Sequence, residues 1–409
     1  MDNSLTKARI ELLLLFILYL FILPRVYMDY DMGFWRQWAL QIHQHGLANT
    51  YNSTINYFPV YIYGLYIYDV LQGTDANIAH NINSIKILFV CFDFLPLVVL
   101  CAFRQKLLTF KIPHLFLLLN VAYVFNSMVW GQIDSIYTNL AFLAIITSIL
   151  YPVGGLLLYV LALNTKQQAI EFLPVMAIIL FYSIRNFKTA IITIASAGAL
   201  QIALLLPFMS TGGTGKLSQI ALNTVGLYHN LSISAFNIWY IIARGNPYFI
   251  NDTDTYILLS YRTVGLILFA VAALAVLIPL FKKVAQLRKS NLPFDEQAHK
   301  VLFLGTGLLC LYFFYFNTQM HERYAMPIII FFFFYGVASK NYKLYILASI
   351  PFILSLDKAF SFPDGYLPIV HYKFIYASRV LAAWYTATVI YGSCVYYRLI
   401  VKPHTITTH

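Results

Sequence analysis

The sequence predicts an all-α polytopic membrane protein. Of its 409 residues, 60% are hydrophobic and only 11% are charged, and the mean hydropathy is +0.71. Soluble domains carry roughly 25% charged residues, so this chain has too few charges to cover a water-exposed surface. Soluble globular, disordered and fibrous proteins are therefore excluded. The chain has no evident repeat or linker, and we expect one integral membrane domain over residues 1–409.

Apolar runs separated by polar segments predict about twelve transmembrane helices. Several runs fall short of the roughly 20 residues that cross a bilayer, and these should lie inside the helix bundle. The first run follows Lys7 and Arg9 as in a signal peptide, but it ends in Leu23-Pro24-Arg25 instead of a cleavage site, so we expect a retained span. The runs cover residues 10–23, 85–103, 115–129, 136–151, 153–163, 169–182, 190–208, 256–280, 301–316, 325–338, 344–354 and 380–395.

The distribution of basic residues predicts the orientation of these spans. Most of the 27 Lys and Arg residues lie near the termini and in short loops that alternate with longer ones. Cytoplasmic loops collect Lys and Arg, which explains the net charge of +11 without a nucleic-acid partner and places both termini in the cytoplasm. The long loops at 25–84, 209–254 and 357–379 then lie on the outer or luminal side of a bacterial inner membrane or an ER membrane. A reaction centre there cannot use cytoplasmic nucleotides.

The first long loop contains the first candidate site. Asp31, Trp35 and Trp38 are spaced so that they share one face of a helix. This pattern predicts a helix in the membrane interface with its aromatic side chains at headgroup depth. Asp29 and Asp31 are the candidate catalytic acids. The structural alternative is that Asp31 only caps the helix.

Further polar strings follow along the first half of the chain. The string Asn56-Tyr57-Phe58-Pro59 opens a tyrosine-rich run that is as typical of a headgroup-level aromatic belt as of a site. Asp134 is either a helix cap or a costly buried acid with a function. Lys166 either binds a lipid phosphate or pairs with Glu171. The candidate substrate-binding residues of this half are Asn56, Tyr57, Gln132, Asp134 and Gln168.

The most unusual string is Gln319-Met320-His321-Glu322-Arg323-Tyr324, which lies between two apolar runs. Arg323 can hold two phosphate oxygens, and His321 can donate to another. A helix beginning near Tyr324 would add the positive end of its dipole. The alternative is a solvated turn between two helices. The candidate substrate-binding residues of this half are Asn237 and Glu322.

No cofactor or metal is expected. The cysteines lie in apolar runs and lack the spacing of a disulfide framework or a metal site; they are Cys91, Cys101, Cys310 and Cys394. The pair Asp29 and Asp31 could recruit a divalent cation, but nothing in the sequence requires one.

Together these strings resemble membrane-embedded glycosyltransferases of the GT-C class, above all the second mannosyltransferase of glycosylphosphatidylinositol-anchor synthesis and its bacterial relatives. The resemblance runs through most of the chain, and its strings occur in the family's order. Asn56 stands where the family has a second acid, and Phe58 and Gln167 stand where it has prolines. The strings are Asp31 with Trp35 and Trp38, Asn56-Tyr57-Phe58-Pro59, Trp130-Gly131-Gln132-Ile133-Asp134-Ser135, Lys166-Gln167-Gln168, Ser232 to Trp239, and Met320-His321-Glu322-Arg323-Tyr324.

The resemblance implies inverting transfer of a hexose, with mannose the first choice, from a polyprenyl-phosphate sugar. The acceptor would be a hydroxyl of a glycan, glycolipid or protein on the outer face. Asp31 would act as the general base, with Asp29 as the substitute for the missing second acid. Arg323, His321 and Lys166 would bind the donor phosphate.

Two other classes of protein fit the composition. A twelve-span transporter or lipid flippase would use charges inside the runs, such as Asp93 and Arg262. Transporters show related halves, whereas here the halves look unrelated, and most ionisable residues outside the basic inner loops cluster at one face. A scaffold subunit without catalysis would be indicated if Asp31 proved dispensable.

Overall fold

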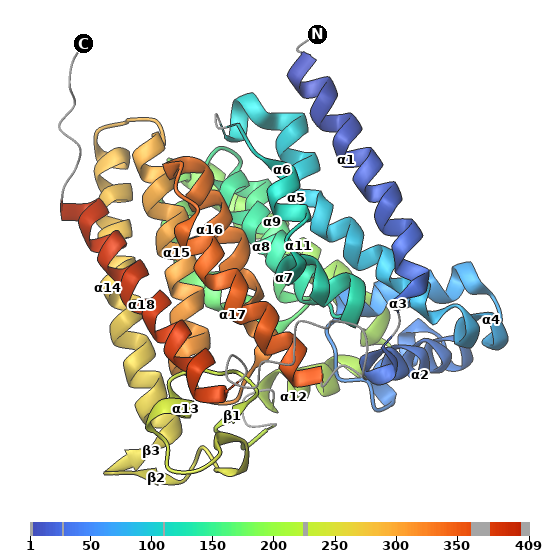
Figure 1. Ribbon diagram of the computed structural model, residues 1–409. Coiled ribbons are helices and arrows are strands. Elements are labelled where there is room, and N and C mark those ends of the chain that lie inside the picture. Colours follow the sequence, from blue (N-terminus) through green and yellow to red (C-terminus); the bar gives the residue numbers. More distant parts are fainter. Residues whose placement is uncertain (1–2, 27, 109–110, 224–227, 361–376, 402–409) are drawn as a thin grey trace. The chain divides into compact units, whose positions relative to one another are not determined.

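Helices form most of the chain in the computed structural model, which describes residues 3–26, 28–108, 111–223, 228–360 and 377–401 (Figure 1). In these residues the strands are limited to two short pairs. The all-α prediction is therefore confirmed. The chain divides into two compact units, Met1–Leu227 and Tyr228–His409, and the expectation of a single functional domain over 1–409 stays a prediction.

The first unit is organised around α8 (Asp134–Ser148), whose side chains are buried along nearly its whole length. This helix packs against α5, α9 and α10. The helices of the unit are α1 (Asn3–Ile22), α2 (Asp29–His45), α3 (Pro59–Gln72), α4 (Asp75–His80), α5 (Lys86–Leu107), α6 (His114–Leu118), α7 (Val121–Val124), α8, α9 (Pro152–Leu163), α10 (Leu173–Ser183), α11 (Phe187–Met209) and α12 (Gly213–Asn223). Shorter turns are η1 (Leu23–Arg25), η2 (Leu47–Asn52), η3 (Ile82–Ile85), the π-helical turn η4 (Phe125–Trp130) and η5 (Gln167–Phe172).

The second unit is a bundle in which α15 and α16 form the buried centre. Helices α14 to α18 run side by side, and the strands lie with α13 at one end of them (Figure 1). The elements are β1 (Ser232–Ile233), α13 (Trp239–Ile242), η6 (Pro247–Phe249), β2 (Thr255–Tyr256), β3 (Leu259–Ser260), α14 (Tyr261–Lys289), α15 (Glu296–Phe316), β4 (Met320–His321), η7 (Glu322–Ala325), α16 (Met326–Ser339), α17 (Lys343–Phe360) and α18 (Ser378–Val401).

Four helices in the described residues are long and apolar enough to cross a membrane, which agrees with a membrane protein. They coincide with four of the expected runs and cover Ile82–Phe103, Phe187–Met209, Tyr261–Lys289 and Glu296–Phe316. Two of the shorter runs form α8 and α16, which are buried inside their own units. This burial is what a short apolar helix requires if it does not face lipid. The total of about twelve spans stays a prediction.

Helix α2 differs from the expected interfacial helix in what covers its aromatic face. Trp35 is only 1% exposed, and Trp38 is also buried. Their rings contact Tyr57 with centroid distances of 5.1 Å each. The prediction that these tryptophans anchor the helix at headgroup depth is therefore wrong, because the segment that follows α2 folds back over them. Phe34, on the same helix, is exposed.

The expected helix caps also differ. Asp31 does not cap α2, because the N-cap is Met28 and Asp31 lies within the first helical turn. Asp134 does not cap α8 either, since Ile133 occupies that position and Asp134 is the first helical residue. Both carboxylates remain near a helix N-terminus, where the dipole favours negative charge, but neither is used to close a backbone hydrogen bond at the cap.

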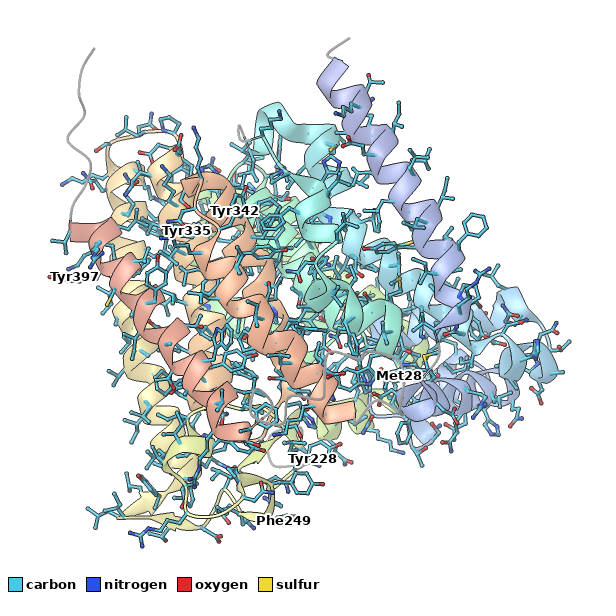
Figure 2. The ribbon with its side chains drawn as sticks, viewed as in Figure 1. Met28, Tyr228, Phe249, Tyr335, Tyr342 and Tyr397 are labelled. Atoms are coloured by element: carbon cyan, nitrogen blue, oxygen red, sulfur yellow. The ribbon has the colours of Figure 1, made fainter. Side chains whose placement is uncertain are left out.

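The turn between α14 and α15 carries the basic residues expected of a cytoplasmic loop. Arg288 and Lys289 end α14, and Asp295 caps α15 by accepting a hydrogen bond from the backbone N–H of Ala298 at 2.6 Å. Helix α15 separates this turn from the string that begins at Gln319. Within this unit, Tyr228 and Phe249 lie at one end, and Tyr335, Tyr342 and Tyr397 lie toward the other (Figure 2).

We predict that the α14–α15 turn is cytoplasmic and that the Gln319–Arg323 string faces the opposite side. Single cysteines can be placed at Ser290 and Thr255, which are exposed in the structure, after the four native cysteines are replaced. A membrane-impermeant thiol reagent should then label only Ser290→Cys from the cytoplasmic side and only Thr255→Cys from the outer side. Labelling of both positions from one side would contradict this orientation.

Candidate functional site

In the first unit, the carboxylate of Asp31 is held by the loop that precedes α8. Its Oδ2 atom accepts hydrogen bonds from Trp130 Nε1 and Gln132 Nε2. Asp31 itself is half-buried, whereas Gln132 is fully buried. Two residues of the Trp-Gly-Gln string therefore fix one carboxylate oxygen of Asp31, although they are about a hundred positions away in the sequence.

Gly131 makes this arrangement possible. Its φ of +79° lies in the left-handed region that favours glycine. A Cβ at this position would lie 2.5 Å from the Met32 sulfur. The Gly131 carbonyl accepts a hydrogen bond from Trp35 Nε1 at 2.8 Å. Trp35 and Asp31 lie four residues apart on one face of α2, so the predicted shared face is confirmed, and both side chains engage the same loop.

Aromatic side chains form a wall beside Asp31. The Trp35 ring lies 4.8 Å from the Tyr61 ring and 5.1 Å from the Tyr57 ring. Burial, with smaller contributions from Tyr57 and Asp31, raises the pKa of Tyr61 well above its ordinary value. The Tyr61 hydroxyl is therefore protonated and can donate a hydrogen bond.

Two buried polar atoms around Asp31 lack a hydrogen-bond partner in the described part of the chain. Among the described residues, nothing hydrogen-bonds to the Tyr61 hydroxyl or to Gln132 Oε1. A buried polar atom without a partner costs about 1–3 kcal/mol. A bound hydroxyl-bearing molecule would remove that cost, since it can accept from Tyr61 and donate to Gln132. These atoms give the surroundings of Asp31 the donor and acceptor pattern of a binding site.

Asp29 differs from Asp31 in exposure and in direction. Its side chain is 70% exposed and lies 3.5 Å from the guanidinium of Arg36. Residues two positions apart do not share a helix face, so the two carboxylates do not form a pair. Among the described residues there is also no cluster of three or more His, Cys, Asp or Glu side chains that could hold a metal.

The segment that holds Asp31 also contributes a buried ion pair. Lys166 Nζ donates to Asp134 Oδ1 at 2.6 Å, and Asp134 is fully buried. The Lys166 ammonium also lies 5.7 Å from the centroid of the Tyr137 ring. Sequence spacing suggested Glu171 as the partner of Lys166; the close ion pair joins Lys166 to Asp134, and the buried Glu171 interacts electrostatically with both groups. Lys166, a candidate ligand of the donor phosphate, thus forms an ion pair with Asp134, a candidate substrate-binding residue.

The remaining sequence candidates of this unit are less enclosed. Asn56 is exposed, and Gln168 is half-buried. The string that contains Asn56 nevertheless reaches the Lys166 segment, because the backbone N–H of Val60 donates to the Asn164 carbonyl at 2.8 Å. Sequence reasoning missed Lys86, which begins α5.

Lys86 is fully buried and supports the same loop. Its Nζ donates to the Val26 carbonyl at 2.9 Å and to the Val129 carbonyl at 3.1 Å. These bonds join the segment before α2 to the residue that precedes Trp130. The only sequence signal was a lysine at the start of an apolar run, which is also typical of a residue that reaches toward the membrane surface.

In the second unit, a short parallel strand pair joins two of the strings. Ser232 and Ile233 in β1 pair with Met320 and His321 in β4. Ser234 also forms a bridge with His321. The two strings are nearly ninety positions apart in the sequence, so a pattern of neighbouring residues could not reveal this pairing.

His321 ends β4, and Glu322 and Arg323 lie in η7, directly before α16. His321 and Glu322 are buried, and the Arg323 side chain is 15% exposed. Arg323 Nη1 lies 3.4 Å from Glu322 Oε1 and 3.5 Å from His321 Nδ1. Its guanidinium also lies 5.4 Å from the centroid of the Tyr324 ring. The string is therefore enclosed, with the Arg323 guanidinium beside the Glu322 carboxylate, and the solvated turn is not observed.

Asn237 holds the Ser232–Trp239 string in place. It is fully buried, and its Nδ2 donates to the carbonyls of Phe314 and Asn317 at 3.2 and 3.3 Å. The Trp239 indole N–H also donates to the Asn317 carbonyl, at 3.1 Å. These contacts attach the string to the end of α15, next to the residues that lead into β4. The described contacts of Asn237 thus position the loop.

A buried carboxylate that sequence reasoning missed organises the approach to His321. Asp252 accepts two hydrogen bonds from Arg262, at 2.9 and 3.0 Å. It also accepts from Thr318 at 2.8 Å and from Gln319 at 2.7 Å. Gln319 has a φ of +60°, a left-handed conformation that is strained for a residue with a side chain. Asp252 therefore fixes the backbone directly before the Met-His-Glu-Arg-Tyr string.

The structure brings the six strings together as two groups, one inside each unit. In the first unit, the strings around Asp31, Asn56, Gln132 and Lys166 converge. In the second unit, the strings around Asn237 and His321 converge. No protein-family model matches the chain, and no curated protein matches it. The function is therefore inferred from the residues and their geometry.

Proposed function

We propose that this protein is a GT-C-like glycosyltransferase. It transfers a hexose, with mannose as the expected sugar, from a polyprenyl-phosphate donor to an acceptor hydroxyl, with inversion at the anomeric carbon. The observation that carries the proposal is the carboxylate of Asp31. One of its oxygens is oriented by Trp130 and Gln132, while buried polar atoms of Tyr61 and Gln132 have no hydrogen-bond partner among the described residues. This arrangement suits a group that accepts a proton from a bound hydroxyl.

Asp31 would act as the general base. As the acceptor oxygen attacks the anomeric carbon, its proton passes to Asp31, and the bond between that carbon and the phosphate oxygen breaks. The electron pair of that bond leaves with the lipid phosphate. General-base catalysis of this kind is worth roughly 10²- to 10⁴-fold in rate. Trp130 and Gln132 hold the carboxylate in place during the transfer.

The lipid phosphate that departs needs stabilisation of its charge. Arg323 and His321, which are enclosed in the second unit, would supply these donors, as the resemblance implies, and α16 begins three residues after Arg323. Lys166 has a different place in the proposal, because its ammonium pairs with Asp134. We therefore propose that the main role of Lys166 is to stabilise the loop that holds Asp31, and that binding of the phosphate is a secondary role.

A transporter or flippase remains the competing class of function. The transporter hypothesis uses Asp93 as a functional charge within a span. Asp93 accepts a hydrogen bond from Ser127. The Tyr123 hydroxyl donates to its backbone carbonyl at 3.1 Å. Arg262, the other such charge, is bound to Asp252 at the start of α14. Both groups therefore have structural partners, which favours the transferase.

The two classes can be separated in one reconstituted system. The purified chain is placed in vesicles that carry a polyprenyl-phosphate sugar with a radioactive sugar, together with a panel of alkyl glycosides as acceptors. The proposal predicts that label moves covalently to an acceptor and that no ion gradient is required. Movement of intact donor between leaflets without any labelled product would support the flippase and contradict the proposal.

Arg323→Lys should reduce turnover at least tenfold, although the charge is kept. The planar guanidinium can hold two phosphate oxygens, whereas an ammonium is a point charge, and a lost charge-assisted hydrogen bond costs about 1.5–3 kcal/mol. Both donor affinity and turnover should be measured, with the exposed Arg398→Lys as control. If Arg323 only balances Glu322, the variant will lose stability, and the fraction that folds will show unchanged kinetics.

A further inference from the structure

The hairpin formed by β2 and β3 exposes three consecutive apolar side chains at one end of the second unit. The two strands pair in antiparallel fashion directly before α14. Ile257 and Leu258 form the tip and are 80% and 87% exposed, and Leu259 is also exposed. The hairpin extends beyond the helices at the start of α14 (Figure 1). A run of exposed apolar residues at a protruding tip indicates an interaction surface.

The backbone at this tip is strained. The N–H of Leu258 donates to the Tyr256 carbonyl at 2.8 Å, which closes a three-residue turn around Ile257. Ile257 has a φ of +62°, and a β-branched residue is seldom found in this left-handed region. Glycine or asparagine would fit the turn with less strain, but neither would place a branched apolar side chain there. The turn therefore presents an apolar side chain that its own unit leaves exposed.

The base of the hairpin is attached to the first turn of α14. The backbone N–H of Tyr261 donates to the Asp254 carbonyl at 3.1 Å, and that of Arg262 donates to the Asp252 carbonyl at 2.9 Å. The Arg262 guanidinium also pairs with the buried Asp252 carboxylate at 2.9 Å. The Tyr256 ring lies 5.0 Å from the Tyr261 ring. Because these contacts fix the base, the position of α14 determines the position of the tip.

The apolar stretch of α14 gives the depth of the hairpin in a membrane. No charged residue lies between Arg262 and Lys282, and this stretch has about the length of the roughly 20 residues that cross the hydrocarbon core. One face of it, with residues three and four apart, is exposed and suits contact with acyl chains; it contains Ile267, Val271, Leu274 and Ile278. Arg262 then lies at the headgroup boundary. Strand β3 ends two residues before Arg262, so the hairpin lies at the same boundary.

We infer that the tip of the β2–β3 hairpin inserts among the lipid headgroups beside the start of α14. Burial of Ile257 and Leu258 against the upper part of the acyl chains is favourable, and residues 255–260 bring no charged side chain into that region. The open edges of so short a hairpin need water as a hydrogen-bonding partner, which limits insertion to headgroup depth. The partner is lipid, because the bilayer around α14 lies beside the tip. The inference does not depend on the proposed sugar transfer.

The test measures the depth of the tip in a bilayer. The full chain, with its four native cysteines replaced, is spin-labelled at Leu258→Cys in phosphatidylcholine nanodiscs, and EPR measures the collision rates of the label with oxygen and with a water-soluble nickel complex. The ratio of oxygen to nickel collisions should be high, as at Leu266→Cys on the exposed surface of α14. It should be low at Thr255→Cys, at the base of the same hairpin. Equal ratios at Leu258→Cys and Thr255→Cys would overturn the inference, and so would low collision rates with both reagents, which indicate a protein partner or a second copy.

A second variant tests whether the apolar side chains cause the insertion. Ile257→Asn combined with Leu258→Gly removes both of them and supplies residues that suit a tight turn, so the hairpin should still form. With the label at Leu259→Cys, the ratio of oxygen to nickel collisions should fall from its value without the two substitutions toward that of Thr255→Cys. An unchanged ratio would contradict the inference. Absence of sugar transfer by a chain whose tip lies in the bilayer would contradict the proposed function alone.

Discussion

Asp31→Asn is expected to leave the protein folded and to reduce sugar transfer by about 100- to 10,000-fold. The amide oxygen of asparagine can still accept hydrogen bonds from Trp130 and Gln132, which hold the carboxylate in the unaltered protein. An amide cannot, however, take the proton of the acceptor hydroxyl. The measurement is turnover of purified protein under saturating donor, together with its unfolding temperature in the same detergent.

Asp29→Asn is the matched control for this experiment. The Asp29 carboxylate is two residues away on the same helix, is 70% exposed, and faces Arg36. We expect its replacement to change turnover by less than the Asp31 change, because Trp130 and Gln132 orient the Asp31 carboxylate. Normal turnover in well-folded Asp31→Asn protein would remove Asp31 as the base, and the transferase would then need another proton acceptor.

Asp134→Ala is expected to destabilise the first unit by about 3–5 kcal/mol, the usual cost of removing one partner of a buried ion pair. The variant would leave the buried Lys166 ammonium without the carboxylate that lies 2.6 Å from it. Chemical unfolding in detergent, followed by tryptophan fluorescence, measures this change.

The control is an ion pair with the same N–O distance at the protein surface. Glu296 and Lys300 also lie 2.6 Å apart, but the Glu296 side chain is 61% exposed, so Glu296→Ala should cost about 1 kcal/mol or less. The double variant Asp134→Ala, Lys166→Met should recover part of the lost stability, because it removes both charges. Equal costs for Asp134→Ala and Glu296→Ala would show that Lys166 does not depend on Asp134.

Composition was sufficient to predict the helical class, since a chain with so few charges can satisfy its backbone in a membrane by forming helices. Periodicity also identified correctly that Asp31 and Trp35 share a face of α2. It could not say what covers that face. Trp35 and Trp38 were expected at the membrane interface, and they pack instead against Tyr57 and its neighbours.

Pairings between distant residues account for most of what the sequence did not predict. An ion pair of Lys166 with Glu171 was predicted as the structural alternative because the two residues are close in sequence. The carboxylate that accepts the hydrogen bond from Lys166, that of Asp134, lies 32 positions away. Lys86 and Asp252 were missed for a related reason. Each is a single charged residue with no pattern around it, and its role appears only when the loops that it joins are placed in space.

The central claim is tested most directly by the anomeric configuration of a transferred sugar. Purified full-length protein is incubated with a polyprenyl-phosphate mannose of known configuration and a panel of alkyl glycosides, and the product is examined by proton NMR. A base that activates the acceptor for a single displacement predicts a product with the configuration opposite to that of the donor. A product of retained configuration, or the absence of product from every polyprenyl-phosphate sugar and acceptor, would contradict the account.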